Sequence, residues 1–170
     1  MIAALYTVMT CFWGEIAYGP FQVRPAEALC ILPIFFAEAV PGLFIGCALA
    51  NIFSQFGVYD VAFGSLTTLV AAILTFIVGR IFKEKFVSVL IGGVPPVVLN
   101  AVFIPLIIVL GGAGENTYFT LFLSFLLTET VWVYGLGIPL FFAVKRIKKT
   151  VLLGEDLKKK GQKNGTDSSE

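Results

Sequence analysis

The sequence of 170 residues contains no histidine and only three cysteines, Cys11, Cys30 and Cys47. Without histidine, a Ser-His-Asp triad, an HExxH zinc site and haem ligation by imidazole are excluded. The cysteines lie in apolar stretches and form no CxxC pair, so we predict small packing residues, with no disulfide framework and no metal site. No cofactor is expected. The chain also lacks a Walker A pattern, so it cannot itself hydrolyse ATP.

Charged residues are scarce as well: Asp, Glu, Lys and Arg make up 14% of the chain, whereas hydrophobic residues make up 58%. A soluble domain typically has about 25% charged and about 45–50% apolar residues. The mean hydropathy of +0.92 therefore excludes an ordinary water-soluble globule. It also excludes a disordered chain, which needs low hydrophobicity and high charge. The seventeen Phe and seventeen Gly fit lipid-exposed helices that pack closely.

Long apolar runs dominate what is present. A spanning helix needs roughly 20 residues, because each residue rises about 1.5 Å and the hydrocarbon core is about 30 Å thick. We expect helices over residues 1–13, 26–37, 40–56, 58–82, 86–110 and 118–144. The second run contains Pro33 and predicts a short or kinked helix. The predicted fold is all-α: a polytopic membrane protein with a bundle of six transmembrane helices in residues 1–149, followed by a disordered cytoplasmic tail, 150–170.

The basic residues predict the orientation of these helices. Arg80, Lys83 and Lys85 lie between the fourth and fifth runs, and eight more Lys and Arg follow the sixth. If both termini are cytoplasmic, eleven of the twelve Lys and Arg are cytoplasmic and only Arg24 lies outside, as the positive-inside rule favours. We therefore expect a multi-pass plasma-membrane protein with both termini in the cytoplasm. The basic cluster after residue 144 suits an anionic inner leaflet and indicates no nucleic-acid site.

In that orientation, acidic residues are concentrated in the outer half of the bundle, where Arg24 is the only basic residue. The five acids are Glu15, Glu27, Asp60, Glu115 and Glu129. A cavity with this excess of acids favours a ligand that carries positive charge or many N–H donors. As an alternative, Glu15, Asp60 and Glu115 could be solvated loop or cap residues. Arg24 and Glu27, three residues apart, could also simply pair with each other.

Glu129 is the acid most difficult to explain as a surface residue. It lies eleven residues into the last run, about 16 Å deep and near the bilayer midplane. A charged carboxylate there costs about 2.5–3.5 kcal/mol, so it usually faces a bundle interior or a water-filled site. Trp132 shares its helix face, and a carboxylate beside an indole suits a flat, donor-rich ring. The alternative is a structural hydrogen bond to Asn100, which lies about 15 Å deep in the fifth run.

Four stretches of the sequence resemble motifs of the QueT family. They lie at residues 22–33, 41–51, 60–69 and 135–140. The first is similar to the signature Q-x-R-x-x-E-A-L…L-P, the second to P-G-L-x-I-G-x-x-L-A-N, and the third to D-x-x-F-G-S-L-x-T-L. The fourth resembles the end of the last helix of the family. Together the similarity covers about residues 3–146.

This family consists of substrate-binding S components of energy-coupling-factor (ECF) transporters, so the resemblance implies a bacterial uptake protein and not an enzyme. It implies six helices, a ligand site near the outer side, and a complex with a transmembrane coupling subunit and two ATPase subunits. The implied ligand is a deazapurine, the queuosine precursor 7-aminomethyl-7-deazaguanine or a close relative. Small residues of the first helix form the coupling face in this superfamily, and Ala3, Ala4 and Thr7 are its candidates here.

The implied ligand agrees with the charge analysis. A deazaguanine presents N1–H and an exocyclic amine to one carboxylate, and its cationic aminomethyl group needs a second acid. The predicted substrate-binding residues are Glu129, Glu27, Trp132, Asn100, Arg24, Asp60 and Asn51. Glu129 is expected to bind the paired N–H groups, and Trp132 to stack on the ring or form a wall of the site. Glu27 and Asp60 are the candidates for the cation, with Glu27 preferred because its motif is the more specific.

Other functions stay open on the sequence alone. One is an S component for a different vitamin-like small molecule. Another is a membrane enzyme, for example one that processes a lipid with Glu27 or Glu129 as acid or base. No nucleophile motif or metal-ligand cluster accompanies these residues, which argues against an enzyme. A structural or scaffold protein is a third alternative, but polar residues concentrated in the outer half argue against it, because a scaffold has no use for buried carboxylates.

Overall fold

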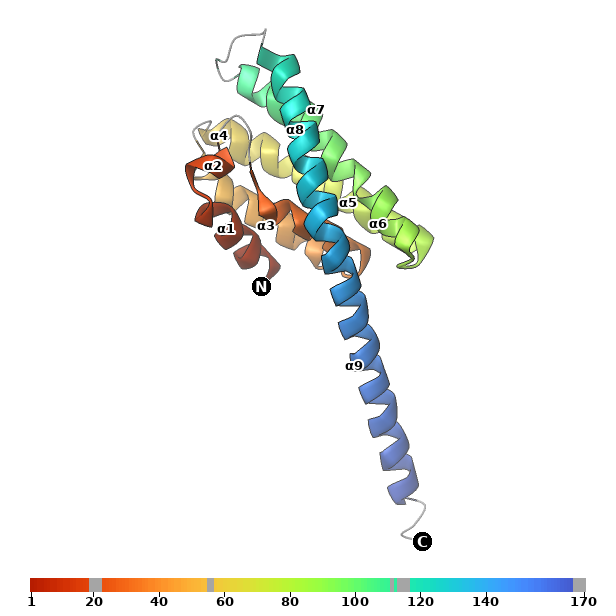
Figure 1. The fold of residues 1–170 in the computed structure, drawn as a ribbon. Coiled ribbons are helices and arrows are strands. Elements are labelled where there is room, and N and C mark those ends of the chain that lie inside the picture. The colour runs from red at the N-terminus through yellow and green to blue at the C-terminus, as the bar shows by residue number, and fades with distance from the viewer. Residues whose placement is uncertain (19–22, 55–56, 111, 113–116, 167–170) are drawn as a thin grey trace.

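The computed structural model describes residues 1–18, 23–54, 57–110, 112 and 117–166, of which 15 and 152–166 are described for the backbone only. Every regular element in these residues is a helix, so the prediction of an all-α fold is confirmed. Three long helical rods pack with three shorter helices, and the last rod extends far beyond the bundle (Figure 1).

Two of the long rods come from the middle of the chain. In the first, α4 (Gly57–Tyr59), the π-helical turn η2 (Asp60–Gly64) and α5 (Ser65–Phe82) follow one another without a break. In the second, α6 (Phe86–Gly92) leads into α7 (Val94–Leu110). Each rod is long and apolar enough to cross a membrane.

The third rod consists of α8 (Tyr118–Thr130), the π-helical turn η4 (Val131–Leu136) and α9 (Gly137–Thr166). The segment Tyr118–Val151 of this rod is also long and apolar enough to cross a membrane. The backbone of α9 stays helical beyond the start of the expected disordered tail, since that segment contains several Leu, Glu and Lys residues, which favour helix. The division of the chain into a bundle and a separate tail stays a prediction.

Three shorter apolar helices complete the bundle: α1 (Ile2–Phe12), the 3₁₀ helix η1 (Pro25–Ile34) and α3 (Ala39–Asn51). A four-residue turn, α2 (Glu15–Tyr18), follows α1. The eleven residues of α1 and thirteen of α3 extend roughly 17–20 Å, less than the hydrocarbon core of about 30 Å. In the described part of the chain, three of the six expected helices thus have spanning length, and six membrane crossings stay a prediction.

The 3₁₀ helix η1 lies at the centre of the bundle, with all ten of its residues buried. It contacts α1, α5, η4 and α9. Pro33 lacks an N–H and its ring would clash with the carbonyl of Leu29 in an α-helix, so a tighter helix is accommodated more easily. The prediction of a short helix in this run is confirmed. At about 2.0 Å per residue, η1 extends roughly 20 Å through the interior.

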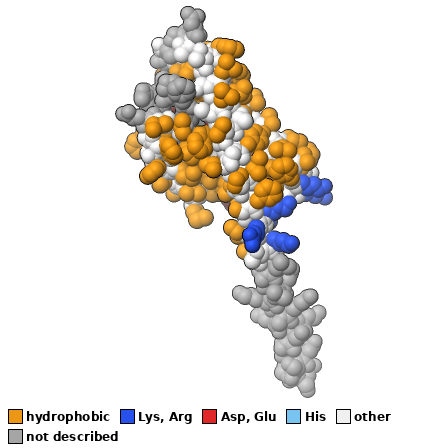
Figure 2. Space-filling model, viewed as in Figure 1, with side chains coloured by type: hydrophobic (Ala, Val, Ile, Leu, Met, Phe, Trp, Pro, Cys, Tyr) orange, Lys and Arg blue, Asp and Glu red, His pale blue; other side chains and the backbone are white. Residues whose placement is uncertain are grey.

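The outer surface of the bundle is apolar. Figure 2 shows hydrophobic side chains over most of the described part of the visible face, with Lys and Arg gathered at one end where α9 leaves the bundle. Large exposed side chains include Phe12, Phe53, Phe63, Leu110 and Leu127. A soluble monomer rarely exposes so much contiguous apolar area. Helices that face lipid do expose such a surface, and their backbone groups are hydrogen-bonded within the helix. The chain is therefore a membrane protein.

Candidate functional site

Four ionisable side chains meet in the interior of the bundle. Arg24 is 4% exposed, Glu27 2%, Asp60 1% and Glu129 5%. They come from the beginning of η1, from η2 and from the end of α8, which are far apart in the sequence. Three acids against one base give the cluster a formal charge of −2 when all four are ionised. An interior of this charge favours a cationic or donor-rich ligand.

Glu27 is the hydrogen-bonding centre of one half of the cluster. Its Oε1 accepts a hydrogen bond from the hydroxyl of Tyr6, and its Oε2 accepts from Sγ of Cys30 at 3.1 Å. Nδ2 of Asn100 lies 3.4 Å from the same Oε2 and 3.1 Å from Oε1 of Glu129. One amide group therefore joins the two carboxylates. We call Glu27, Asn100 and Glu129 the Glu129 group.

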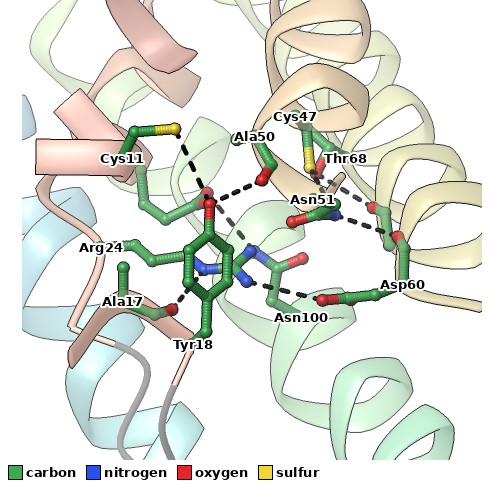
Figure 3. Close-up of polar contacts among 12 residues, drawn as sticks. Cys11, Ala17, Tyr18, Arg24, Cys47, Ala50, Asn51, Asp60, Thr68 and Asn100 are labelled. Carbon is green, nitrogen blue, oxygen red and sulfur yellow. Dashed lines mark hydrogen bonds and ion pairs between the residues drawn. The ribbon is translucent and has the colours of Figure 1, made fainter. Parts of the chain in front are cut away.

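Arg24 and Asp60 lie side by side in the other half of the cluster (Figure 3). Nη2 of Arg24 is 3.8 Å from Oδ2 of Asp60. Nε of Arg24 donates to the Ala17 carbonyl at 2.9 Å, and its guanidinium carbon lies 5.4 Å from the centroid of the Tyr18 ring. Tyr18 is itself fixed, because its hydroxyl donates to the Ala50 carbonyl at 2.6 Å. Arg24 is thus held from two sides with one end of its guanidinium directed at Asp60.

Asn51 completes this half, which we call the Arg24 group: Arg24, Asn51 and Asp60. Nδ2 of Asn51 donates to the backbone carbonyl of Asp60 at 3.0 Å and so ties the end of α3 to the π-helical turn η2. π-helical turns inside α-helices are frequent at functional sites. Gly64 makes room for both side chains. A Cβ there would lie 2.9 Å from Nδ2 of Asn51 and 2.9 Å from Oδ1 of Asp60.

Four buried polar atoms in these two groups have no hydrogen-bond partner among the described residues. They are Nη2 of Arg24, Oδ1 of Asn51, Oδ2 of Asp60 and Oε2 of Glu129. Each unsatisfied buried group costs about 1–3 kcal/mol, so native structures contain few of them. Four in one cluster, three acceptors and one donor, point to a polar ligand that donates more hydrogen bonds than it accepts.

The structure thus brings together six of the seven predicted substrate-binding residues. The interpretation of Asp60 as a solvated residue is wrong, because burial leaves it 1% exposed. The ion pair of Arg24 is with Asp60, and not with Glu27 as the simpler alternative had it. The hydrogen bond between Asn100 and Glu129, expected if Glu129 were structural, is present, but it occupies only Oε1 of that carboxylate.

Trp132, the seventh residue, lies in η4, directly after the helix that carries Glu129. The centroid of its ring is 6.3 Å from that of Trp13, with the planes tilted by 54°. The two tryptophans of the chain therefore pair across α1 and the third rod. Stacking of Trp132 on a ligand stays a prediction.

Sequence reasoning missed Tyr6 and Cys30, both of which donate to Glu27. Both lie in apolar runs; Cys30 is predicted to be a packing residue, and no role is predicted for Tyr6. Two signals could have found them: a buried tyrosine hydroxyl needs a partner, and a residue three positions after Glu27 lies directly above it on a 3₁₀ helix. Of the other acids considered, the side chain of Glu15 and all of Glu115 lie outside the described residues.

The predicted coupling-face residues lie on two sides of α1. Ala3 and Thr7 face α3, where the Thr7 hydroxyl donates to the Gly46 carbonyl at 3.1 Å. A Cβ on Gly46 would lie 2.8 Å from the Ala3 carbonyl oxygen, so the two helices touch at this glycine. Ala4 and Val8 are exposed on the opposite side. The coupling role of these residues stays a prediction.

A separate apolar groove of about 650 Å³ lies between the rod formed by α4, η2 and α5 and the helix α7. Tyr59, Phe63 and Val70 line one side, and Phe103 and Leu110 line the other. None of the predicted substrate-binding residues lines it. Because its walls are almost entirely apolar, the groove offers a polar ligand few hydrogen bonds.

Most of the chain matches the model of a known protein family. The family model described as QueT transporter matches residues 1–146, which include both polar groups and all helices up to the first turns of α9. No curated protein and no solved structure matches the chain.

Proposed function

The chain belongs to the QueT transporter family, and from this premise we propose that it is the substrate-binding S component of an ECF-type uptake transporter. As a member of a transporter family it is not an enzyme. Its proposed ligand is a queuosine precursor, 7-aminomethyl-7-deazaguanine or a close relative. A transmembrane coupling subunit and two ATPase subunits of the ECF module supply the energy for uptake, since this chain has no Walker A pattern.

The observation that carries this proposal is the set of four buried atoms in the Arg24 and Glu129 groups, three acceptors and one donor, that have no hydrogen-bond partner among the described residues. A 7-aminomethyl-7-deazaguanine has donors at N1, at the exocyclic amine and at the cationic aminomethyl group, and an acceptor at the ring carbonyl. We expect Glu129 to accept from the paired N–H groups; its Oε2 has no partner among the described residues, and Asn100 donates to its Oε1. The cationic group offsets one of the two excess negative charges of the cluster.

We also propose a multi-pass topology in the bacterial plasma membrane, with both termini in the cytoplasm. Lys148 of α9 forms an ion pair with Glu84 in the turn between α5 and α6, so the two basic segments lie at the same end of the bundle. That arrangement supports a common cytoplasmic side for these charges. A cysteine probe introduced at Asn116 should react with an impermeant reagent from outside, and one at Lys148 should not. The reverse pattern would contradict this topology.

The direct test is calorimetric titration of 7-aminomethyl-7-deazaguanine into the purified protein, without ATP and without partner subunits. Binding is expected, because all the proposed ligand contacts lie within one chain. Absence of binding would overturn the proposed ligand, and mass spectrometry of small molecules that copurify with the protein would then identify the actual one. Accumulation against a gradient in vesicles that contain only this chain would overturn the assignment as an S component.

A further inference from the structure

We propose that Asp60, and not Glu27, receives the ligand's primary ammonium group, while Nη2 of Arg24 holds the neighbouring ring carbonyl. This inference rests on the proposed function, because it concerns how that site distinguishes an aminomethyl group from other substituents on the same ring. It makes Arg24 and Asp60 the specificity-determining pair of the site.

The carboxylate of Glu27 is already occupied by donors from the protein itself. Tyr6 donates to its Oε1, and Cys30 and Asn100 donate to its Oε2. Three of the about four acceptor positions of a carboxylate are therefore in use. Tyr6 is 0% exposed, so a ligand that displaced its hydroxyl would leave a buried donor without an acceptor. Glu27 is better suited to positioning its neighbours than to receiving a new cation.

Asp60, by contrast, has a carboxylate oxygen that is available to accept a hydrogen bond. Its Oδ2 is buried and has no hydrogen-bond partner among the described residues. Nη2 of Arg24 is 3.8 Å away, whereas a charge-assisted hydrogen bond is about 2.7–2.9 Å long. The two groups therefore attract each other without bonding, and each keeps its hydrogen-bonding capacity for a third partner.

The Arg24 group also matches the chemistry of one edge of the proposed ligand. In 7-aminomethyl-7-deazaguanine the ring carbonyl and the 7-substituent project from the same edge of the fused ring, so an acceptor and a cationic donor lie side by side. The Arg24 group presents the complement, a donor nitrogen and an acceptor oxygen 3.8 Å apart. Oδ1 of Asn51, also unpartnered among the described residues, belongs to the same group and adds an acceptor for the ammonium. A 7-methyl group in that place would leave Oδ2 of Asp60 without a donor.

The pair is also held in place before any ligand arrives. Nε of Arg24 is bound to the Ala17 carbonyl and its guanidinium lies over the Tyr18 ring, so Nη2 has little freedom to turn away. Asn51 fixes the backbone of Asp60. Such preorganisation reduces the entropy lost when the ligand binds.

The experiment compares 7-aminomethyl-7-deazaguanine with 7-methyl-7-deazaguanine by calorimetric titration. The readout is the ratio of their dissociation constants in the wild type, in Asp60→Asn and in the matched control Glu27→Gln. The wild type should prefer the aminomethyl compound by roughly 10- to 100-fold, the range of one hydrogen bond to a charged group. Asp60→Asn should reduce the ratio to about threefold or less. Glu27→Gln removes the same charge, and it should keep the ratio even if both affinities fall.

The outcomes separate this inference from the proposed function. A preference that survives Asp60→Asn and disappears in Glu27→Gln would overturn the inference, since the ammonium would then lie at Glu27. Equal binding of both compounds to the wild type would overturn it too, while leaving a deazaguanine site intact. Binding of neither compound to the wild type would overturn the proposed function itself.

A second variant covers the case in which Asp60→Asn does not fold, since it leaves Arg24 buried without its partner. Arg24→Gln combined with Asp60→Asn removes both charges of the pair. A melting curve recorded without ligand checks that this protein is folded. The double variant should bind both compounds with a ratio near one, and a retained preference of tenfold or more would contradict the inference.

Discussion

The two polar groups of the interior differ in how completely they are satisfied. In the Glu129 group, Asn100 joins two carboxylates and Tyr6 and Cys30 add further donors, so one oxygen is left without a partner in the described structure. In the Arg24 group, each of the three side chains has an unpartnered atom there. The first group resembles a framework with one acceptor directed at a ligand. The second resembles a site whose hydrogen bonds are completed by the ligand.

The largest expected effect comes from changing Oε2 of Glu129, the acceptor of the Glu129 group that has no partner among the described residues. Glu129→Gln keeps the shape of the side chain and an oxygen for Asn100, but it places an amide donor where the ligand's own donors are expected. Binding of 7-aminomethyl-7-deazaguanine should weaken by more than about 2 kcal/mol, the scale of a lost charge-assisted hydrogen bond. The melting temperature without ligand should stay the same or rise, because a buried charge is removed.

Calorimetric titration and a melting curve of each protein measure these two effects. Unchanged affinity in Glu129→Gln would mean that the carboxylate is purely structural. The Glu129 group would then be a framework only, without an acceptor for the ligand.

A smaller effect is expected from crowding the Arg24 group. The Cβ of Gly64→Ala would approach Asn51 and Asp60 at 2.9 Å, so both side chains must move. Overpacking of this kind costs about 1–3 kcal/mol. We expect ligand affinity to fall roughly tenfold, which corresponds to about 1.4 kcal/mol.

The matched control is Gly135→Ala in η4, where an added Cβ meets nothing within 4 Å. Its affinity should equal that of the wild type within about twofold. Equal affinities of Gly64→Ala and the wild type would show that the Arg24 group tolerates displacement and does not touch the ligand.

A third change tests the framework itself. Tyr6→Phe removes the hydroxyl that donates to Oε1 of Glu27 and leaves that oxygen without this donor. The free energy of unfolding should fall by about 1 kcal/mol, while the preference for the aminomethyl over the methyl compound should persist. Thermal unfolding and the same pair of titrations measure both quantities.

Tyr59→Phe, at a side chain 61% exposed, serves as the control and should leave stability unchanged. Loss of the preference in Tyr6→Phe would mean that Glu27 is part of the binding group.

The smallest effect is expected far from both groups. Truncation after Lys149 removes a segment low in apolar residues, which cannot bury a face against the bundle. Titration of the truncated protein should give the affinity of the full chain. A large loss would show that the segment after residue 149 supports the site.

Much of the site could be predicted because of the free-energy cost of burying polar groups. A carboxylate in the apolar run around Glu129 needs a polar partner, and Asn100 was the nearest candidate in the neighbouring run. The depth of Arg24 and Glu27 could not be predicted in the same way. Depth follows from sequence position only if each run begins at the membrane surface. The helix η1 is short, and Glu27 in its first turn accepts a hydrogen bond from Asn100 in the middle of a long rod. Length alone does not say where a short helix lies along a longer one.

The contact of Tyr6 with Glu27 has a thermodynamic consequence. α1 carries Tyr6 on one side and the exposed residues Ala4 and Val8 on the other, so one helix of eleven residues borders both the buried polar cluster and the surroundings of the protein. A shift of α1 relative to η1 changes the environment of Glu27, and a ligand that alters the Glu27 hydrogen bonds changes the preferred position of α1. Linkage requires this relation to be reciprocal. If a partner that contacts the exposed side of α1 changes the affinity for the ligand by some factor, the ligand changes the affinity for that partner by the same factor.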